Sequence, residues 1–297
     1  MTDQQNSLWK ISKLVSPVDG ILIRYAVMNR SNHCRRALVF SNGRTEWIEK
    51  YTDFLSQDLG IPEDIMIVAI DHRGQGDSEG SRAHASSYRD YAQDLLAVIE
   101  KTCSHLPYDL ICHSMGGLIG MCAVLDKQIK PERFISSGPL FGLPNSPVPR
   151  IVARPLASIL SSVGLNELGI GVGNFEKVKF EENVLTSDPG KWEIVKSNPY
   201  PIPGPTFGWV HATFNAIDEV FVDTKIGALT CPVLILVGER EEVVDRNSIY
   251  RWAELAKKLS RQSIAIETIT DGKHELFFEG GKIYTTAIEH VKKFLAL

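Results

Sequence analysis

The chain has 297 residues, which suits one large α/β core with an insertion better than one minimal domain. Its hydrophobic content of 43% is ample for a buried core, and its net charge of -4 offers no basic surface to nucleic acid. No apolar run reaches the length of a membrane span. The segment Met1 to Lys10 is polar and lacks the regions of a signal peptide, so we expect a cytoplasmic protein.

Cysteine and histidine usage gives no sign of a disulfide framework or a metal site. The chain contains neither a C-x-x-C pair nor an H-x-x-x-H pair. An odd number of scattered cysteines fits reduced thiols, and we expect neither a metal nor a cofactor. The cysteines are Cys34, Cys103, Cys112, Cys122 and Cys231.

Strand patterns alternate with helix patterns through the first half of the chain. We predict strands at 20–28, 36–40, 65–70, 108–113 and 134–137, and helices at 47–59, 88–103 and 115–125. This order favours a mainly parallel central sheet with helices on both faces. The glycine-rich loop at 71–78 follows a strand but does not open a helix, so the sequence does not support a dinucleotide site.

A short apolar strand, a tight turn and a helix rich in small residues meet at Ser114. This arrangement is typical of a nucleophile elbow, in which a strained turn raises a serine hydroxyl above the sheet edge. Gly116 supplies the small residue that the close crossing of strand and helix requires. Cys112 stands where glycine is usual, a departure that a small side chain should tolerate. Ser114 is our candidate nucleophile; the alternative is a capping serine in an ordinary strand-turn-helix.

The character of the chain changes after residue 138. We interpret residues 139–224 as a helical cap inserted between two parts of the core, 1–138 and 225–297. The cap carries two apolar stripes at helical spacing, which indicate either packing onto the core or an acyl-chain pocket or lipid-facing surface. The first comprises Ile151, Val152, Leu156, Ile159, Leu160 and Val163; the second comprises Phe207, Trp209, Phe214 and Ile217.

A serine nucleophile needs a general base and an acid that orients it. Strand patterns resume at 232–238 and 263–268, and helices follow at 247–259 and 281–297. In this architecture the order is nucleophile, acid, base, each after a strand. His274, on the loop before the final helix, has the expected place of the base. Glu241 and Asp245 both follow the strand that ends at Gly238; we favour Glu241, because it lies closer to the strand end and Asp245 suits a helix N-cap.

The other histidines lack such a context. His113 lies beside the serine but should point elsewhere on so tight a turn, and we interpret it as a strand-end residue. We interpret His72, His84 and His211 as surface or capping residues.

An oxyanion hole requires two backbone donors. We expect the amide of Met115, directly after the nucleophile, and the amide of Arg44, in the loop after the strand at 36–40. The Arg44 side chain either meets a charged head group or is an ordinary surface arginine.

Taken together, the chain resembles the α/β-hydrolase superfamily, in particular its bacterial lysophospholipase and monoacylglycerol lipase branch, also labelled serine aminopeptidase-like. The resemblance implies the α/β-hydrolase fold and a triad of Ser114, His274 and an acid. Monoacylglycerol lipases have aspartate at the position of Glu241, and the loop at 41–43 lacks the common His-Gly start. The motifs that carry the resemblance are NGRTE at 42–46, DHRGQG at 71–76, HSMGG at 113–117, SGPLFG at 137–142 and KHE at 273–275.

The resemblance implies a cofactor-free serine hydrolase that cleaves esters of single-chain lipids, such as lysophospholipids or monoacylglycerols, through an acyl-enzyme. One alternative is a carboxylesterase acting on small soluble esters. Another, from a different class, is a non-catalytic binding protein with this fold. We expect a lipid ester as partner and no nucleic acid, with the cap touching lipid aggregates or the inner face of a membrane as a further hypothesis.

Overall fold

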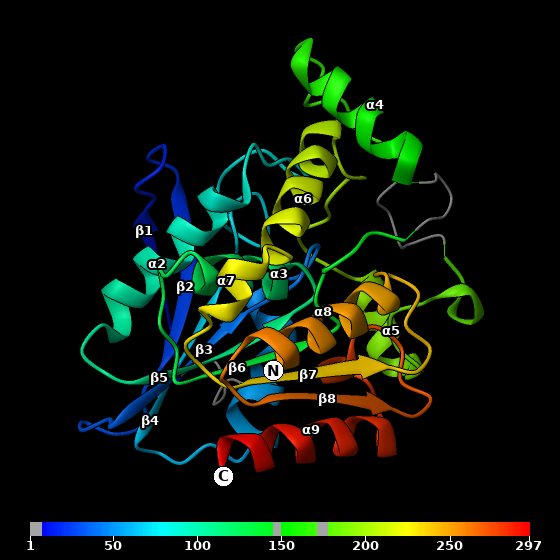
Figure 1. Cartoon of the computed structure of the whole chain (residues 1–297). Helices are drawn as coiled ribbons and strands as arrows, with labels where there is room; N and C mark the ends of the chain where they lie inside the picture. Colours follow the sequence, from blue (N-terminus) through cyan, green and yellow to red (C-terminus); the bar gives the residue numbers. More distant parts are fainter. Residues whose placement is uncertain (1–7, 145–149, 171–177) are drawn as a thin grey trace.

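A single mixed sheet runs through the protein (Figure 1). The computed structural model describes residues 8–144, 150–170 and 178–297. Within these residues the strand order is β1-β2-β4-β3-β5-β6-β7-β8; β1 and β2 are antiparallel to their neighbours, and β3 to β8 run parallel. The strands are β1 (Trp9–Val15), β2 (Leu22–Met28), β3 (Arg36–Ser41), β4 (Ile65–Ile70), β5 (Tyr108–His113), β6 (Arg133–Ser137), β7 (Val233–Gly238) and β8 (Ile264–Ile269).

The central strands are apolar on both faces because helices cover both sides of the sheet. In β3, Val39 belongs to one hydrophobic core, while Leu38 and Phe40 belong to the other. Helices α2, α3 and α8 pack into the core of Val39, and η1, η2 and α9 pack into the opposite one. The core helices are η1 (Ile48–Tyr51), η2 (Phe54–Asp58), α2 (Tyr88–Cys103), α3 (Met115–Leu125), α8 (Arg246–Leu259) and α9 (Gly281–Leu295), and η5 (Leu276–Phe278) is a short turn.

The structure confirms the predicted fold class and the predicted core elements, with shifts of a residue or two at their ends. It differs in two places. The segment predicted as one helix at 47–59 is a 3₁₀ turn followed by π-helical backbone. The edge strand β1 was not predicted, although alternate residues such as Trp9 and Ile11 are apolar. Residues 1–7, part of the polar N-terminal segment, lie outside the described residues.

Between β6 and β7 the described chain is helical: α4 (Arg150–Ser162), η4 (Phe180–Glu182), α5 (Pro189–Lys196), α6 (Phe207–Val220) and α7 (Asp223–Gly227). Residues 145–149 and 171–177 of the predicted cap lie outside the described residues. In α6, Trp209 and Ile217 pack into the core of Val39, as the prediction of packing onto the core requires. Phe214 is also buried, but it belongs to neither core and lies beside Arg154 of α4, with Cζ 5.9 Å from the ring centre.

Helix α4 lies at the far end of the molecule, on top of α6 (Figure 1). For its apolar stripe, packing onto the core is the wrong interpretation. Ile151 is 85% exposed and Ile159 is 60% exposed, and Val152, Leu156 and Val163 are exposed as well. Amphipathic spacing indicates that a helix has an apolar face but does not indicate what covers it. Among the described residues, no helix combines the length and apolarity needed to cross a bilayer.

Candidate active site

The carboxyl ends of the parallel strands lie at one edge of the sheet, and the candidate residues follow them. Ser41 at the end of β3 is in register with Cys112 in β5, and His113 pairs with Ser137 of β6. Glu241 follows β7 and His274 follows β8. Residues distant in sequence therefore meet at this edge.

Ser114 has the backbone conformation of a strained turn. Its φ is 51° and its ψ is -115°, a region that L-residues rarely adopt. Hydrogen bonds hold the turn against the segment after β6: Ser114 donates its amide to Ser137 O at 2.9 Å, and its carbonyl accepts from the amide of Leu140 at 3.0 Å. Gly116 is required here, because a Cβ at this position would lie 2.2 Å from Ser41 O.

The structure explains how the turn accommodates Cys112. This side chain is fully buried between β5 and α3. A Cβ on Gly120, one helical turn past Gly116, would lie 2.9 Å from Cys112 Sγ. In the usual motif the strand residue is glycine and lacks a side chain. Here the strand residue is Cys112, and the helix residue that faces it, Gly120, lacks the side chain instead.

His274 and Glu241 form a buried pair, with Nδ1 of the imidazole 2.7 Å from Oε2 of the carboxylate. A carboxylate accepts hydrogen bonds, so Nδ1 carries the proton and Nε2 is the basic nitrogen. Burial lowers the pKa of His274, but the charge and hydrogen bond of Glu241, together with the charges of Glu275 and Glu46, leave this pKa above its ordinary value. The other oxygen of Glu241 accepts from the amides of Val243 at 2.8 Å and Val244 at 3.1 Å.

Asp245, the alternative acid, lies at the start of α8. Its carboxylate accepts from the amide of Asn247 at 3.2 Å and from the hydroxyl of Ser248. It is the N-cap residue of this helix, the role that its sequence context favoured.

Two other histidines lie in the same region of the molecule. His113 is buried and donates from Nδ1 to Ser137 O at 3.1 Å. It lines the same cavity as Ser114, and its ring centre lies 4.7 Å from that of His274. The surface or capping interpretation of His72 is wrong: its ring is fully buried, with Nε2 2.8 Å from Ser41 Oγ. Burial and the neighbouring Arg73 lower the pKa of His72 to about 3. The sequence could not reveal this contact, because Ser41 belongs to a different strand.

Ser114 and His274 line one cavity of about 180 Å³. No hydrogen bond joins their side chains in the described structure, and such contacts are often loose before substrate binds. Met115 and Arg44, the predicted oxyanion donors, line the same cavity. Its apolar wall comes from both the core and the segment between β6 and β7, through Leu140, Leu143, Leu185, Trp209, Val243 and Val244.

A network of buried charges lies beside the cavity. Lys50 Nζ is 2.8 Å from Glu46 Oε1 and 2.7 Å from Glu275 Oε2. The second oxygen of Glu46 accepts the amide of Gly43, next to Arg44. Burial raises the pKa of Glu46, but Lys50, His113 and the hydroxyl of Tyr51 together lower it, so the pKa lies below its ordinary value.

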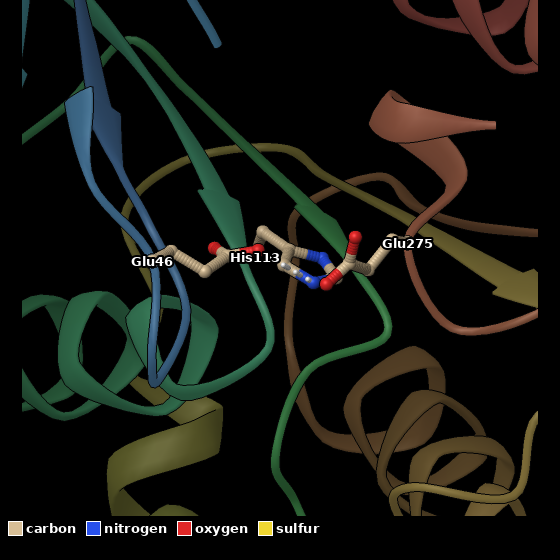
Figure 2. Close-up of side chains that lie close together, drawn as sticks. All are labelled: Glu46, His113 and Glu275. Atoms are coloured by element: carbon tan, nitrogen blue, oxygen red, sulfur yellow. Dashed lines mark ion pairs between the residues drawn. The ribbon is translucent and has the colours of Figure 1, made fainter. Parts of the chain in front are cut away.

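Figure 2 shows that Glu46, His113 and Glu275 face one another, with ligand atoms within 4.8 Å. Such a trio is a combination that binds metals. Here the ammonium of Lys50 supplies the positive charge between the two carboxylates. The geometry therefore favours an ion-pair network over a metal centre. The sequence reveals only the spacing of Glu46 and Lys50, because Glu275 is distant in the chain.

Replacing Lys50 by methionine should lower the free energy of unfolding by about 3–5 kcal/mol, because it leaves two buried carboxylates without their cation. Denaturant unfolding measures this change. The added substitution Glu275→Gln should recover part of the loss. As a control, Lys257→Met removes an exposed ion pair with Glu254 and should cost less than about 1 kcal/mol. Equal losses in Lys50→Met and the control would contradict this account.

This chain is similar to a known family and to named proteins over most of its length. A family model described as "Serine aminopeptidase, S33" matches residues 32–281. The chain is 29% identical to "Probable lysophospholipase L2" of Haemophilus influenzae over 88% of this chain and 84% of that protein. It is 27% identical to human "Monoglyceride lipase" over 75% of this chain and 71% of that protein.

Two solved structures share the fold. A soluble variant of monoglyceride lipase from Saccharomyces cerevisiae, in complex with a substrate analog, superposes with a TM-score of 0.76 at 19% identity. The superposition covers 97% of this chain and 96% of the lipase chain. A thermostable carboxyl esterase from Bacillus coagulans has a TM-score of 0.77 at 14% identity and covers 97% and 98%. At these identities the likeness concerns the fold.

Proposed function

The chain belongs to the serine aminopeptidase S33 family, and from this premise we propose that it hydrolyses carboxylic esters of single-chain lipids, with Ser114 as nucleophile. The observation that carries the proposal is the buried pair of His274 and Glu241, at a cavity that Ser114 also lines. The lysophospholipase and monoglyceride lipase names of its relatives support lipid esters as the substrate class.

In the first half of the reaction, Ser114 Oγ attacks the ester carbonyl carbon and gives its proton to His274 Nε2. The backbone amides of Met115 and Arg44 donate to the oxygen on which negative charge develops. The resulting imidazolium is stabilised by Glu241 and protonates the alcohol oxygen as the carbon–oxygen bond breaks. The alcohol leaves, and the acyl group stays on Ser114.

In the second half, a water molecule attacks the acyl carbonyl while His274 takes its proton. The tetrahedral intermediate collapses, His274 returns the proton to Ser114 Oγ, and the fatty acid leaves. The chain's own residues thus supply the nucleophile of the first half and the base and charge stabilisation of both halves, and water is the nucleophile of the second.

A fluorophosphonate probe should label Ser114, because the probe reacts with an activated serine hydroxyl. Peptide mass mapping locates the adduct. Ser114→Ala should abolish labelling, whereas the exposed control Ser197→Ala should retain it. An unlabelled but folded protein would favour the binding-protein alternative.

The pH dependence should report His274, which must be neutral to act as a base. Activity should rise as pH increases through its raised pKa. Glu241→Gln removes the carboxylate that raises this pKa, so the acid limb of kcat/KM should move to lower pH. The same change should reduce kcat about 1,000-fold or more, because the imidazolium loses its partner.

Asp245→Asn is the matched control for that measurement. Asparagine caps a helix about as well as aspartate, so this change should alter the free energy of unfolding by less than about 1 kcal/mol and should not move the acid limb. An acid limb that moves in Asp245→Asn but stays in Glu241→Gln would reverse the assignment of the acid.

We further propose that residues 139–224 act as a cap whose helix α4 touches lipid aggregates or a membrane surface. The exposed apolar stripe of α4 supports this, because Ile151, Val152 and Ile159 are all more than half exposed. Figure 1 shows that this helix lies at the end of the molecule. A carboxylesterase on small soluble esters would have no use for such a surface.

The double substitution Ile151→Ser and Ile159→Ser tests this contact. It should lower turnover of long-chain esters in vesicles about 30-fold or more, since each buried isoleucine contributes on the order of 1 kcal/mol or more. Turnover of a short soluble ester should stay unchanged. Ile194→Ser on α5, also exposed, is the control. Equal turnover of vesicle-bound ester by the double variant and the unaltered protein would refute the membrane contact.

A further inference from the structure

Among the residues that the structure describes, no carboxylate pairs with the side chain of Arg44, a cation at the candidate active site. It lines the same cavity as Ser114. Its Nη2 donates to the carbonyl of Pro203 at 2.7 Å, and Cζ lies 5.3 Å from the centre of the Trp209 ring. Nε is shielded from solvent and lacks an acceptor among the described residues. These contacts do not fit an ordinary surface arginine.

The acids that line or adjoin the cavity are already engaged. Glu46 and Glu275 pair with Lys50, and Glu241 pairs with His274. Within the described part of the chain, no carboxylate forms an ion pair with Arg44, and burial lowers its pKa. An arginine nevertheless stays protonated at neutral pH. The cavity therefore carries a partly desolvated positive charge that an anionic group of the substrate can neutralise.

We propose that the Arg44 guanidinium binds the phosphate of a lysophospholipid and so selects this substrate over a neutral monoacylglycerol. The inference rests on the proposed function and names the substrate class of the same site. A guanidinium presents a planar fork of donors that matches phosphate oxygens, and glycerol offers no such anion. The Trp209 ring and the Pro203 carbonyl hold the guanidinium in place before the substrate binds.

Covalent connectivity supports this assignment. In the proposed mechanism the backbone amide of Arg44 donates to the ester carbonyl oxygen. The amide nitrogen and Cζ of an arginine are separated by the same number of bonds as the ester carbonyl carbon and the phosphorus of a 1-acyl lysophospholipid. One residue can therefore contact both ends of the glycerol backbone, with its amide at the ester and its guanidinium at the phosphate.

The test compares two palmitoyl substrates in the same neutral-detergent micelles: lysophosphatidylethanolamine and monopalmitoylglycerol. We divide kcat/KM for the lysophospholipid by kcat/KM for the monoacylglycerol. In Arg44→Met this ratio should fall about 10- to 100-fold, because a charged hydrogen-bonded pair is lost. Any change in the oxyanion loop affects both substrates and cancels in the ratio. Arg44→Lys keeps the charge without the fork and should give an intermediate ratio.

Arg251→Met is the matched control, since Arg251 also lies over an aromatic ring, with Cζ 4.5 Å from the centre of Phe221, but does not line the cavity. Its ratio should equal that of the unaltered protein. A ratio unchanged in both Arg44→Met and Arg44→Lys would overturn this inference alone. An unaltered protein that hydrolyses neither lipid would overturn the proposed function and the inference with it.

Discussion

The ammonium of Lys50 joins the two loops between which the candidate active site lies. Through Glu46 it is connected to the amide of Gly43, in the loop after β3. It also pairs with Glu275, the residue directly after His274 in the loop after β8. Both contacts are buried, where charges interact strongly and their loss is costly. One side chain thus links the loop of the proposed oxyanion amide to the loop of the proposed base.

The distribution of charge around the cavity follows from this arrangement. Three carboxylates adjoin the site, and each has a partner within the protein: Glu46 and Glu275 share Lys50, and Glu241 binds His274. Arg44 adds a positive charge to the lining of this cavity, whose wall is mostly apolar. A cavity of this kind suits a molecule with an apolar chain and a negative group. Lipids with one acyl chain and a phosphate combine these features.

Local patterns were enough to predict most of the core and the position of the elbow. The apolar strand, tight turn and small-residue helix around Ser114 are neighbours in sequence, and the places of His274 and Glu241 follow from the order of strands. Features that depend on distant pairings were missed. His72, in the loop after β4, is buried and contacts Ser41 at the end of β3, which lies 31 residues earlier in the chain. The exposure of Ile159 depends on what covers α4, which its own spacing cannot show. The catalytic roles of Ser114, His274 and Glu241 stay predictions.

The pairing of Cys112 with Gly120 bears on how this turn is recognised in other sequences. Strand and helix must approach closely, and the sum of the two facing side chains sets the separation. The glycine can stand on either the strand or the helix. A glycine two residues before the serine is therefore one solution among at least two. A search pattern written on the turn alone would discard this chain. A pattern that scores positions 112 and 120 jointly would retain it and would admit other swapped pairs.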